Sequence, residues 1–162
     1  MSFTLKGTEN LSVKEKYDFI KLFIKGQVRD EKDSLALMAN ISAIIMALVA
    51  DLNWAGFYLV QGDQLVLGPF QGLPACTRLD YDKGVCAKAW RDKEPVLVED
   101  VHAFPGHVAC DSASKSELVI PLIKDGQVYG VLDLDSPKAA RFTKDDQEEF
   151  VQIVEIFQDH LI

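Results

Sequence analysis

The spacing of apolar residues changes along this chain from a helical period to a strand period and back, and that order constrains the fold. A helical period covers residues about 12–52 as two segments, with apolar residues every three or four positions. Short strand-like segments fill residues about 53–136, and a last helical segment covers about 143–160. Strands that can pair with their sequence neighbours, between helices at both ends, predict an α+β fold with a central antiparallel sheet flanked by helices.

Polar residues mark where the helices begin. Ser12 precedes Glu15 by three positions, and Thr143 precedes Asp146 in the same way. Both pairs fit the reciprocal hydrogen bonding that caps a helix N-terminus. We expect the first helix to run up to Gly26, because glycine often ends a helix.

The strand-like segments form two hairpins. Aromatic and β-branched residues surround the turns at Gln61–Gln64 and Lys124–Gln127, which is typical of antiparallel pairs. With a short helix between them, the expected elements are strands at 54–60, 65–67, 95–98, 118–123 and 128–132 and a helix at 84–91. We expect one domain over residues 1–162, a length that supports a sizeable core.

Composition excludes several classes of protein. A net charge of −8 and a pI near 4.8 oppose binding to nucleic acid, which requires clustered Lys and Arg. The longest apolar run, Ala43–Ala50, is too short to cross a membrane, and the N-terminus lacks the apolar core of an export signal. Three cysteines cannot form a fully paired framework in a monomer. We therefore expect a cytoplasmic protein with reduced thiols.

The sulfur of this chain is concentrated in one Gly- and Pro-rich stretch that holds Cys76, Cys86 and Cys110. Thiolates that react need polar, partly exposed surroundings, so this placement favours chemistry over packing. His102 and His107 precede Cys110 in an irregular connection. Either imidazole could lower the pKa of a thiol, although anchoring of the loop is the favoured interpretation. A zinc site from these two histidines and Cys110 lacks the usual ligand spacing, so no metal is expected.

Side chains alternate between the two faces of a strand, and this alternation brings further candidate site residues together. It places Trp54 and Tyr58 on one face of a strand, and Asp133 and Asp135 on one face of another. Two aromatic rings can enclose an apolar group while a carboxylate holds an amine. Glu117 stands where a loop becomes a buried strand, and desolvation there would raise its pKa. Each candidate has an alternative interpretation without function. The two aromatic residues would be ordinary core residues, the two aspartates would lie on a solvated sheet face, and the glutamate would lie at the surface.

Several motifs together resemble the free methionine-(R)-sulfoxide reductases, which are stand-alone GAF-type domains. The resemblance runs from about Trp54 to the last helix, and the cysteines have the family's spacing of ten and twenty-four residues. The segments that carry it are Gly68–Cys76, Gly84–Cys86, Asp100–Asp111 and Ser114–Glu117, followed by Pro121.

The resemblance implies a thiol-dependent reduction of free methionine sulfoxide. By it, Cys110 is the nucleophile that takes the sulfoxide oxygen, and the sulfenic acid then condenses with a second thiol. Cys76 is the first choice for that second thiol, and Cys86 is expected to relay the disulfide or to replace Cys76. Thioredoxin is the implied reductant, with no metal or organic cofactor. A homodimer through the N-terminal helices is compatible with a GAF-type domain.

The same resemblance assigns the pocket. Glu117 and Asp135, together with Asp133, would bind the sulfoxide oxygen and the substrate amine, with one carboxyl as proton donor. Trp54 and Tyr58 would enclose the methyl and thioether end. The alternatives are a GAF-type sensor of a small ligand or of redox state, and an interaction domain with incidental cysteines. Because a sensor is usually joined to an effector domain, we expect this chain to be an enzyme.

Overall fold

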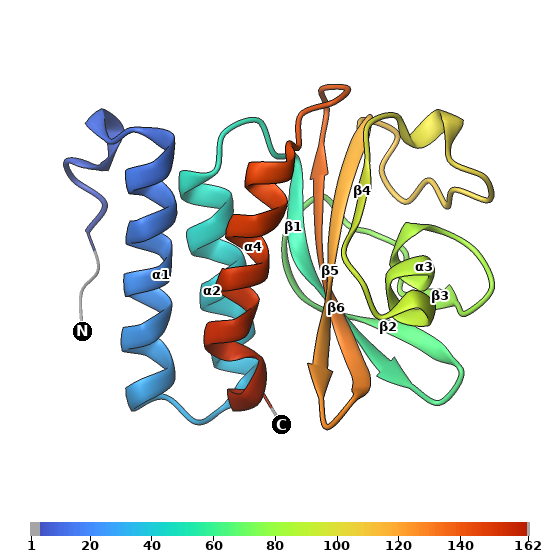
Figure 1. Cartoon of the computed structure of the whole chain (residues 1–162), viewed down its shortest axis with the longest axis horizontal. Helices are drawn as coiled ribbons and strands as arrows, with labels where there is room; N and C mark the ends of the chain where they lie inside the picture. The colour runs from blue at the N-terminus through green and yellow to red at the C-terminus, as the bar shows by residue number, and fades with distance from the viewer. Residues whose placement is uncertain (1–3, 162) are drawn as a thin grey trace.

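A six-stranded antiparallel sheet separates two unlike layers in the computed structural model, which describes residues 4–161 (Figure 1). The helices are α1 (Val13–Asp30), α2 (Ser34–Leu48), α3 (Val85–Asp92) and α4 (Lys144–Phe157), with 3-10 turns η1 (Thr8–Asn10), η2 (Val101–Ala103) and η3 (Gln158–His160). The strands are β1 (Trp54–Gln61), β2 (Gln64–Gly72), β3 (Arg78–Asp80), β4 (Val96–Val98), β5 (Ser116–Lys124) and β6 (Gln127–Ser136), in the order β3-β2-β1-β6-β5-β4. The predicted α+β architecture is confirmed.

Helices α2 and α4 cover one face of the sheet, and α1 packs outside them (Figure 1). The other face carries α3 and the long connections around it. No helix within residues 4–161 combines the length and the apolar character that a membrane crossing requires.

The predicted helix starts are confirmed. Ser12 accepts a hydrogen bond from the Glu15 backbone and Thr143 from that of Asp146, each in a complete capping box. The predicted end at Gly26 is wrong, because α1 continues to Asp30. A glycine inside a helix costs only about 1 kcal/mol. Burial of the apolar residues on both sides of it outweighs this cost.

Strand alternation creates two separate apolar cores. Residues that point toward the helices include Ala55, Phe57, Leu118, Ile120, Leu132 and Leu134. Their neighbours along each strand point toward α3 and include Trp54, Tyr58, Val119 and Val131. A side chain on β1, β5 or β6 therefore belongs either to the structural core or to the α3 side, where the cysteines lie.

Strand β2 is longer than the expected 65–67, and β3 was not expected. The longer strand includes Pro69, although proline cannot donate to a ladder. Here β3 pairs with β2 only over Gln64–Val66, so beyond Val66 one edge of β2 has no strand beside it and tolerates proline. The three residues of β3 include a single apolar one, which gives no alternation to detect.

A bulge in the second hairpin sets the register of the sheet beside α3. Asp125 and Gly126 form the turn with positive φ angles of 50° and 75°, as a tight two-residue hairpin turn requires. The ladder shifts by one residue beyond Leu122. As a result Glu117 of β5 lies directly opposite Asp135 of β6, and their side chains share the face toward α3.

Candidate active site

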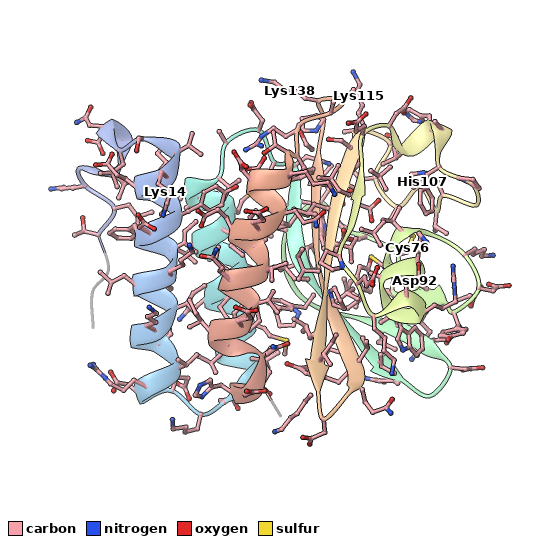
Figure 2. The ribbon with its side chains drawn as sticks, in the orientation of Figure 1. Lys14, Cys76, Asp92, His107, Lys115 and Lys138 are labelled. Carbon is pink, nitrogen blue, oxygen red and sulfur yellow. A yellow bond between two sulfur atoms is a disulfide. The ribbon has the colours of Figure 1, made fainter. Side chains whose placement is uncertain are left out.

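Two of the cysteines form a disulfide on the α3 side of the sheet. Cys76 lies in the loop after β2, and Cys110 lies 34 residues later in the connection before β5. Their Cα atoms are 5.3 Å apart, within the normal range for a disulfide. Figure 2 places Cys76 and His107 on this side of the molecule. Cys86, in the first turn of α3, is a buried free thiol.

A small pocket of about 40 Å³ lies next to this disulfide. Six predicted site residues line it: Tyr58, Cys86, Cys110, Glu117, Asp133 and Asp135. Trp54 is buried beside Tyr58 and, like Cys76, is not among the residues that line the pocket. Most of the residues that the sequence predicted for the site therefore line this pocket.

Three carboxyl groups come to the pocket from two neighbouring strands. Glu117 lies opposite Asp135, and Asp133 lies two residues before Asp135 on the same face of β6. Glu117 and Asp133 are buried, and Asp135 is half-buried. The interpretation of Asp133 and Asp135 as residues on a solvated sheet face is wrong, because α3 and the loops cover that face.

Burial changes the protonation of this cluster. It raises the pKa of Glu117 well above the usual range, with the charges of Asp133 and Asp135 adding to the shift. Burial likewise raises the pKa of Asp135, with the charge of Asp133 next in importance. For Asp133, burial raises the pKa to about 6. Glu117 and Asp135 therefore hold their protons to higher pH than exposed carboxyl groups do.

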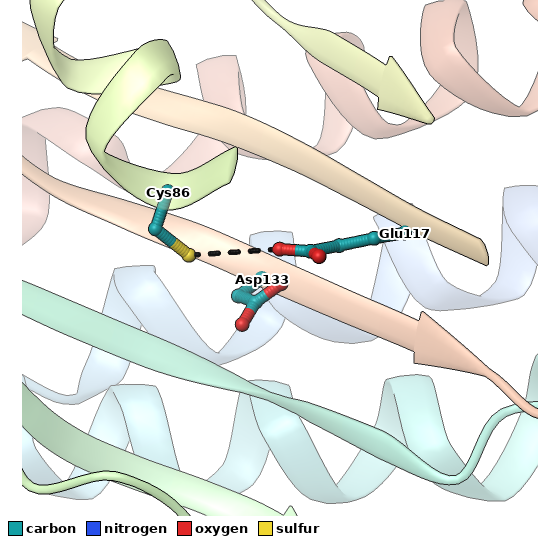
Figure 3. Close-up of side chains that lie close together, drawn as sticks. All are labelled: Cys86, Glu117 and Asp133. Carbon is teal, nitrogen blue, oxygen red and sulfur yellow. Dashed lines mark hydrogen bonds between the residues drawn. The ribbon is translucent and has the colours of Figure 1, made fainter. Parts of the chain in front are cut away.

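Cys86 lies against the same carboxyl groups (Figure 3). Its Sγ is 3.9 Å from Glu117 Oε1, and the ligand atoms of Cys86, Glu117 and Asp133 all lie within 4.8 Å of one another. Burial, followed by the charge of Asp133, raises the pKa of the Cys86 thiol. A metal ion here would have to displace protons that burial retains. The other candidate zinc ligands are His102, His107 and Cys110. The Cys110 sulfur is bonded to Cys76 and so is not a thiolate ligand.

One oxygen in the pocket has no partner. Asp133 Oδ1 is buried and accepts no hydrogen bond. Buried polar atoms are normally satisfied, and an orphan at a site calls for an explanation. A cationic donor on a bound molecule would satisfy it.

His107 is a pocket residue whose place the sequence did not reveal. Its Nε2 is 3.9 Å from Glu117 Oε2, so it faces the carboxyl cluster. An ionised carboxylate at this distance would raise the histidine pKa. Instead burial, followed by the charge of His102, lowers the pKa of His107. Gly106, with φ of 71°, makes the turn just before His107. This glycine is the sequence signal that could have indicated the path of the loop.

Comparison with known proteins decides the family. A model of the GAF domain matches residues 37–159. The free methionine-R-sulfoxide reductase of Escherichia coli (strain K12) is 49% identical over 124 residues, which are 76% of this chain and 75% of that protein. The protein of the same name from Saccharomyces cerevisiae is 38% identical, covering 87% and 83%. The chain belongs to the free methionine-(R)-sulfoxide reductase family.

A solved structure agrees with this assignment. The free methionine-R-sulfoxide reductase from Neisseria meningitidis, in complex with its substrate, superimposes with a TM-score of 0.87 at 39% identity. The superposition covers 99% of this chain and 94% of that one. The chain is thus a reductase on a GAF fold, as the sequence motifs implied.

The two aromatic residues of this reductase hold the loop that carries Cys76. The Trp54 Nε1–H donates to the carbonyl of Leu73 at 3.2 Å, and the Tyr58 hydroxyl donates to that of Cys76 at 2.9 Å. Trp54 stacks on Tyr58 and on Phe70, with ring centroids 5.8 and 5.2 Å apart. These rings therefore do more than fill a core, because they fix the backbone before the disulfide.

The reductase pocket is also lined by a lysine that the sequence did not indicate. Lys83 lines it together with Gly84 and Val85, where α3 begins, and its Nζ lies 3.6 Å from Asp80 Oδ2. Gly84 caps the helix without a side-chain hydrogen bond. The free backbone N–H groups of a helix N-terminus attract anions. The pocket is thus lined by carboxyl groups and also by a helix N-terminus and a lysine.

Proposed function

We propose that this reductase converts free L-methionine-(R)-sulfoxide to L-methionine with a Cys110 thiolate. The observation that carries the proposal is the pairing of Cys110 with Cys76 beside a pocket lined by Glu117, Asp133 and Asp135. A thiol couple supplies the two electrons of the reduction. The carboxyl cluster supplies protons that the leaving oxygen needs.

In the first step, the Cys110 sulfur attacks the sulfoxide sulfur. As the sulfur–oxygen bond breaks, the oxygen is protonated and passes as a hydroxyl group to Cys110 Sγ. Methionine leaves with the electron pair of its bond to Cys110, which becomes a sulfenic acid. Glu117 is our choice for the proton donor, because burial keeps it protonated at neutral pH and it lines the pocket with Cys110. Asp135 has a raised pKa as well and can return the proton to Glu117.

In the second step, the Cys76 thiol attacks Cys110 Sγ, water leaves and a disulfide forms. The Cys76–Cys110 bond supports this pairing. Cys86 is buried and free, which favours Cys76 over Cys86 as the direct partner. A protein dithiol such as thioredoxin then reduces the disulfide, becoming oxidised itself. Such recycling suits a reducing compartment such as the cytoplasm.

The free amino acid is recognised by its two charged ends. The ammonium group binds Asp133, whose Oδ1 lacks a hydrogen bond and which is the most acidic of the three carboxyl groups. The carboxylate binds at Lys83 and the start of α3. The ring of Tyr58 contacts the methyl end. A residue within a polypeptide has neither charged end, so it is rejected.

The reduced form is the one that binds substrate. A pocket of about 40 Å³ is small beside the roughly 300–1,000 Å³ of usual small-molecule sites. Breaking the disulfide frees the connection that carries Cys110 and lets the pocket widen. Substrate therefore enters when a thiolate is available to react.

The test is to incubate the purified protein and a dithiol with each epimer of free methionine sulfoxide and to measure methionine. We expect turnover with the (R) epimer alone and none in Cys110→Ser. The matched control is Cys86→Ser, which removes a thiol from the same pocket and should retain part of the activity. Absence of turnover with either epimer would contradict the proposal and favour a sensor.

A further inference from the structure

We propose that the exposed residues Leu73 and Pro74 form the docking contact for the protein dithiol that reduces the enzyme, and that this partner attacks Cys76. The inference rests on the proposed function, since it concerns the same disulfide. Leu73 is 65% exposed and stands three residues before Cys76. Pro74 is exposed beside it.

The segment is held in place from below. The Trp54 indole holds the Leu73 carbonyl and the Tyr58 hydroxyl holds the Cys76 carbonyl. Both anchors act on the backbone, so the Leu73 side chain is left pointing outward. A contact that is fixed before binding loses little conformational entropy when a partner arrives.

The stretch of chain that leads to Cys76 suits a protein partner. Residues 64–77 contain no charged side chain, although 26% of the whole chain is charged. The buried centres of protein interfaces are depleted in charged residues. An outward leucine beside a reactive disulfide thus offers an apolar contact where a partner must approach.

The two sulfurs of the disulfide differ in position. Cys110 lines the substrate pocket, whereas Cys76 is not among the residues that line it. A partner thiolate that attacks Cys76 Sγ forms a mixed disulfide there, and the electron pair of the broken bond leaves on Cys110. The second thiol of the partner then releases Cys76. Cys110 is thereby returned as a thiolate facing the pocket.

The test compares two reductants with the variant Leu73→Ser. With thioredoxin and its reductase, we expect the KM for thioredoxin to rise roughly tenfold, because a buried leucine contact is lost. With dithiothreitol, which needs no docking surface, the rate should not change. The matched control is Leu22→Ser on α1, where an equally exposed leucine (70%) lies away from the disulfide and should leave both values unchanged.

A second measurement uses the unmodified reductase in its disulfide form. A thioredoxin variant that retains only its attacking cysteine should be trapped on Cys76, as peptide mapping by mass spectrometry would show. Trapping on Cys110, or an unchanged KM for thioredoxin in Leu73→Ser, would overturn the proposal. Absence of turnover by the unmodified protein with dithiothreitol would instead overturn the proposed function, and the docking surface with it.

Discussion

The hydroxyl of Tyr58 donates a hydrogen bond of 2.9 Å to the backbone carbonyl of Cys76. The same ring lines the pocket that holds Cys110. Under the proposed function, this one side chain contacts the substrate and fixes the backbone of the thiol that must reach Cys110. The contact would then link substrate binding to the formation of the disulfide.

The first prediction concerns Tyr58→Phe, which keeps the ring and removes the hydroxyl. Loss of one neutral hydrogen bond costs about 1 kcal/mol, so disulfide formation should slow roughly fivefold. The sulfenic acid should accumulate, because its formation does not need the Cys76 loop. Trapping with dimedone after mixing the reduced protein with one equivalent of substrate measures this.

The control for that experiment is Tyr129→Phe. Tyr129 also donates its hydroxyl to a backbone carbonyl, that of Gln158, far from the disulfide. Its loss should leave the sulfenic acid yield unchanged. Equal accumulation in both variants would show that Tyr58 has only a general structural role.

The second prediction separates the roles of two carboxyl groups. Glu117→Gln removes the proton donor, so kcat should fall roughly 10²- to 10⁴-fold with little change in KM. Asp133→Asn removes the partner of the substrate ammonium, and a hydrogen bond to a charged group is worth about 1.5–3 kcal/mol. Its KM should therefore rise roughly 10- to 100-fold. Steady-state kinetics measure both constants. If kcat alone fell in both variants, or KM alone rose in both, these roles would be contradicted.

The third prediction is a dependence of stability on pH. Burial raises the pKa of Asp133 from 3.8 to about 6. Between these values the folded protein binds more protons than the unfolded one, so stability falls as pH rises through this window and stays lower above it. Two units of pKa correspond to about 3 kcal/mol. At pH 7.5, Asp133→Asn should therefore have a higher free energy of unfolding than the unmodified protein, by up to this amount. Below pH 3.8 the two proteins should be equally stable.

Urea unfolding of both proteins at several pH values measures this difference. The gain in stability and the loss of substrate affinity should occur in the same variant. A destabilised Asp133→Asn protein at pH 7.5 would show that the buried carboxylate is satisfied in the folded state, contrary to the unpartnered Oδ1.

The fourth prediction concerns Gly56, which lies opposite Asp133 on β1. A Cβ at this position would lie 2.3 Å from the Phe70 Cβ and 2.8 Å from the Trp54 ring. Since neither neighbour can move without disturbing the stack of rings, Gly56→Ala should destabilise the protein by about 1–3 kcal/mol. Thermal unfolding measures the loss of stability. The control is Gly26→Ala, where a Cβ meets nothing within 4 Å, and this change should not destabilise the protein.

Local signals in the sequence were sufficient for much of the fold. The capping residues Ser12 and Thr143 and the turn at Asp125–Gly126 act through their immediate neighbours, so they can be recognised without the rest of the chain. Gly26 was a misleading signal for a helix end, because its effect depends on tertiary context. It lies in a helix held by its buried face.

The geometry of the site depended on contacts that no local pattern reveals. The turn pairs Lys124 with Gln127, and without the bulge this register would place Glu117 opposite Leu134, on the helix side. The bulge places it opposite Asp135 instead. The cysteine spacing could suggest the pairing of Cys76 with Cys110 only through resemblance to a family.

Other features had no signal of their own in the sequence. The positions of His107 and Lys83 at the pocket depend on the path of irregular loops. The extent of a single domain over residues 1–162 and a homodimer through the N-terminal helices stay predictions.

The most direct measurement of the central claim is a single turnover. The protein is fully reduced, freed of reductant and mixed with one equivalent of free L-methionine-(R)-sulfoxide, and its methionine and disulfide content are then determined. We predict one methionine per protein and a new bond between Cys76 and Cys110, with Cys86 still a free thiol. Methionine formed without oxidation of Cys110 would contradict the account.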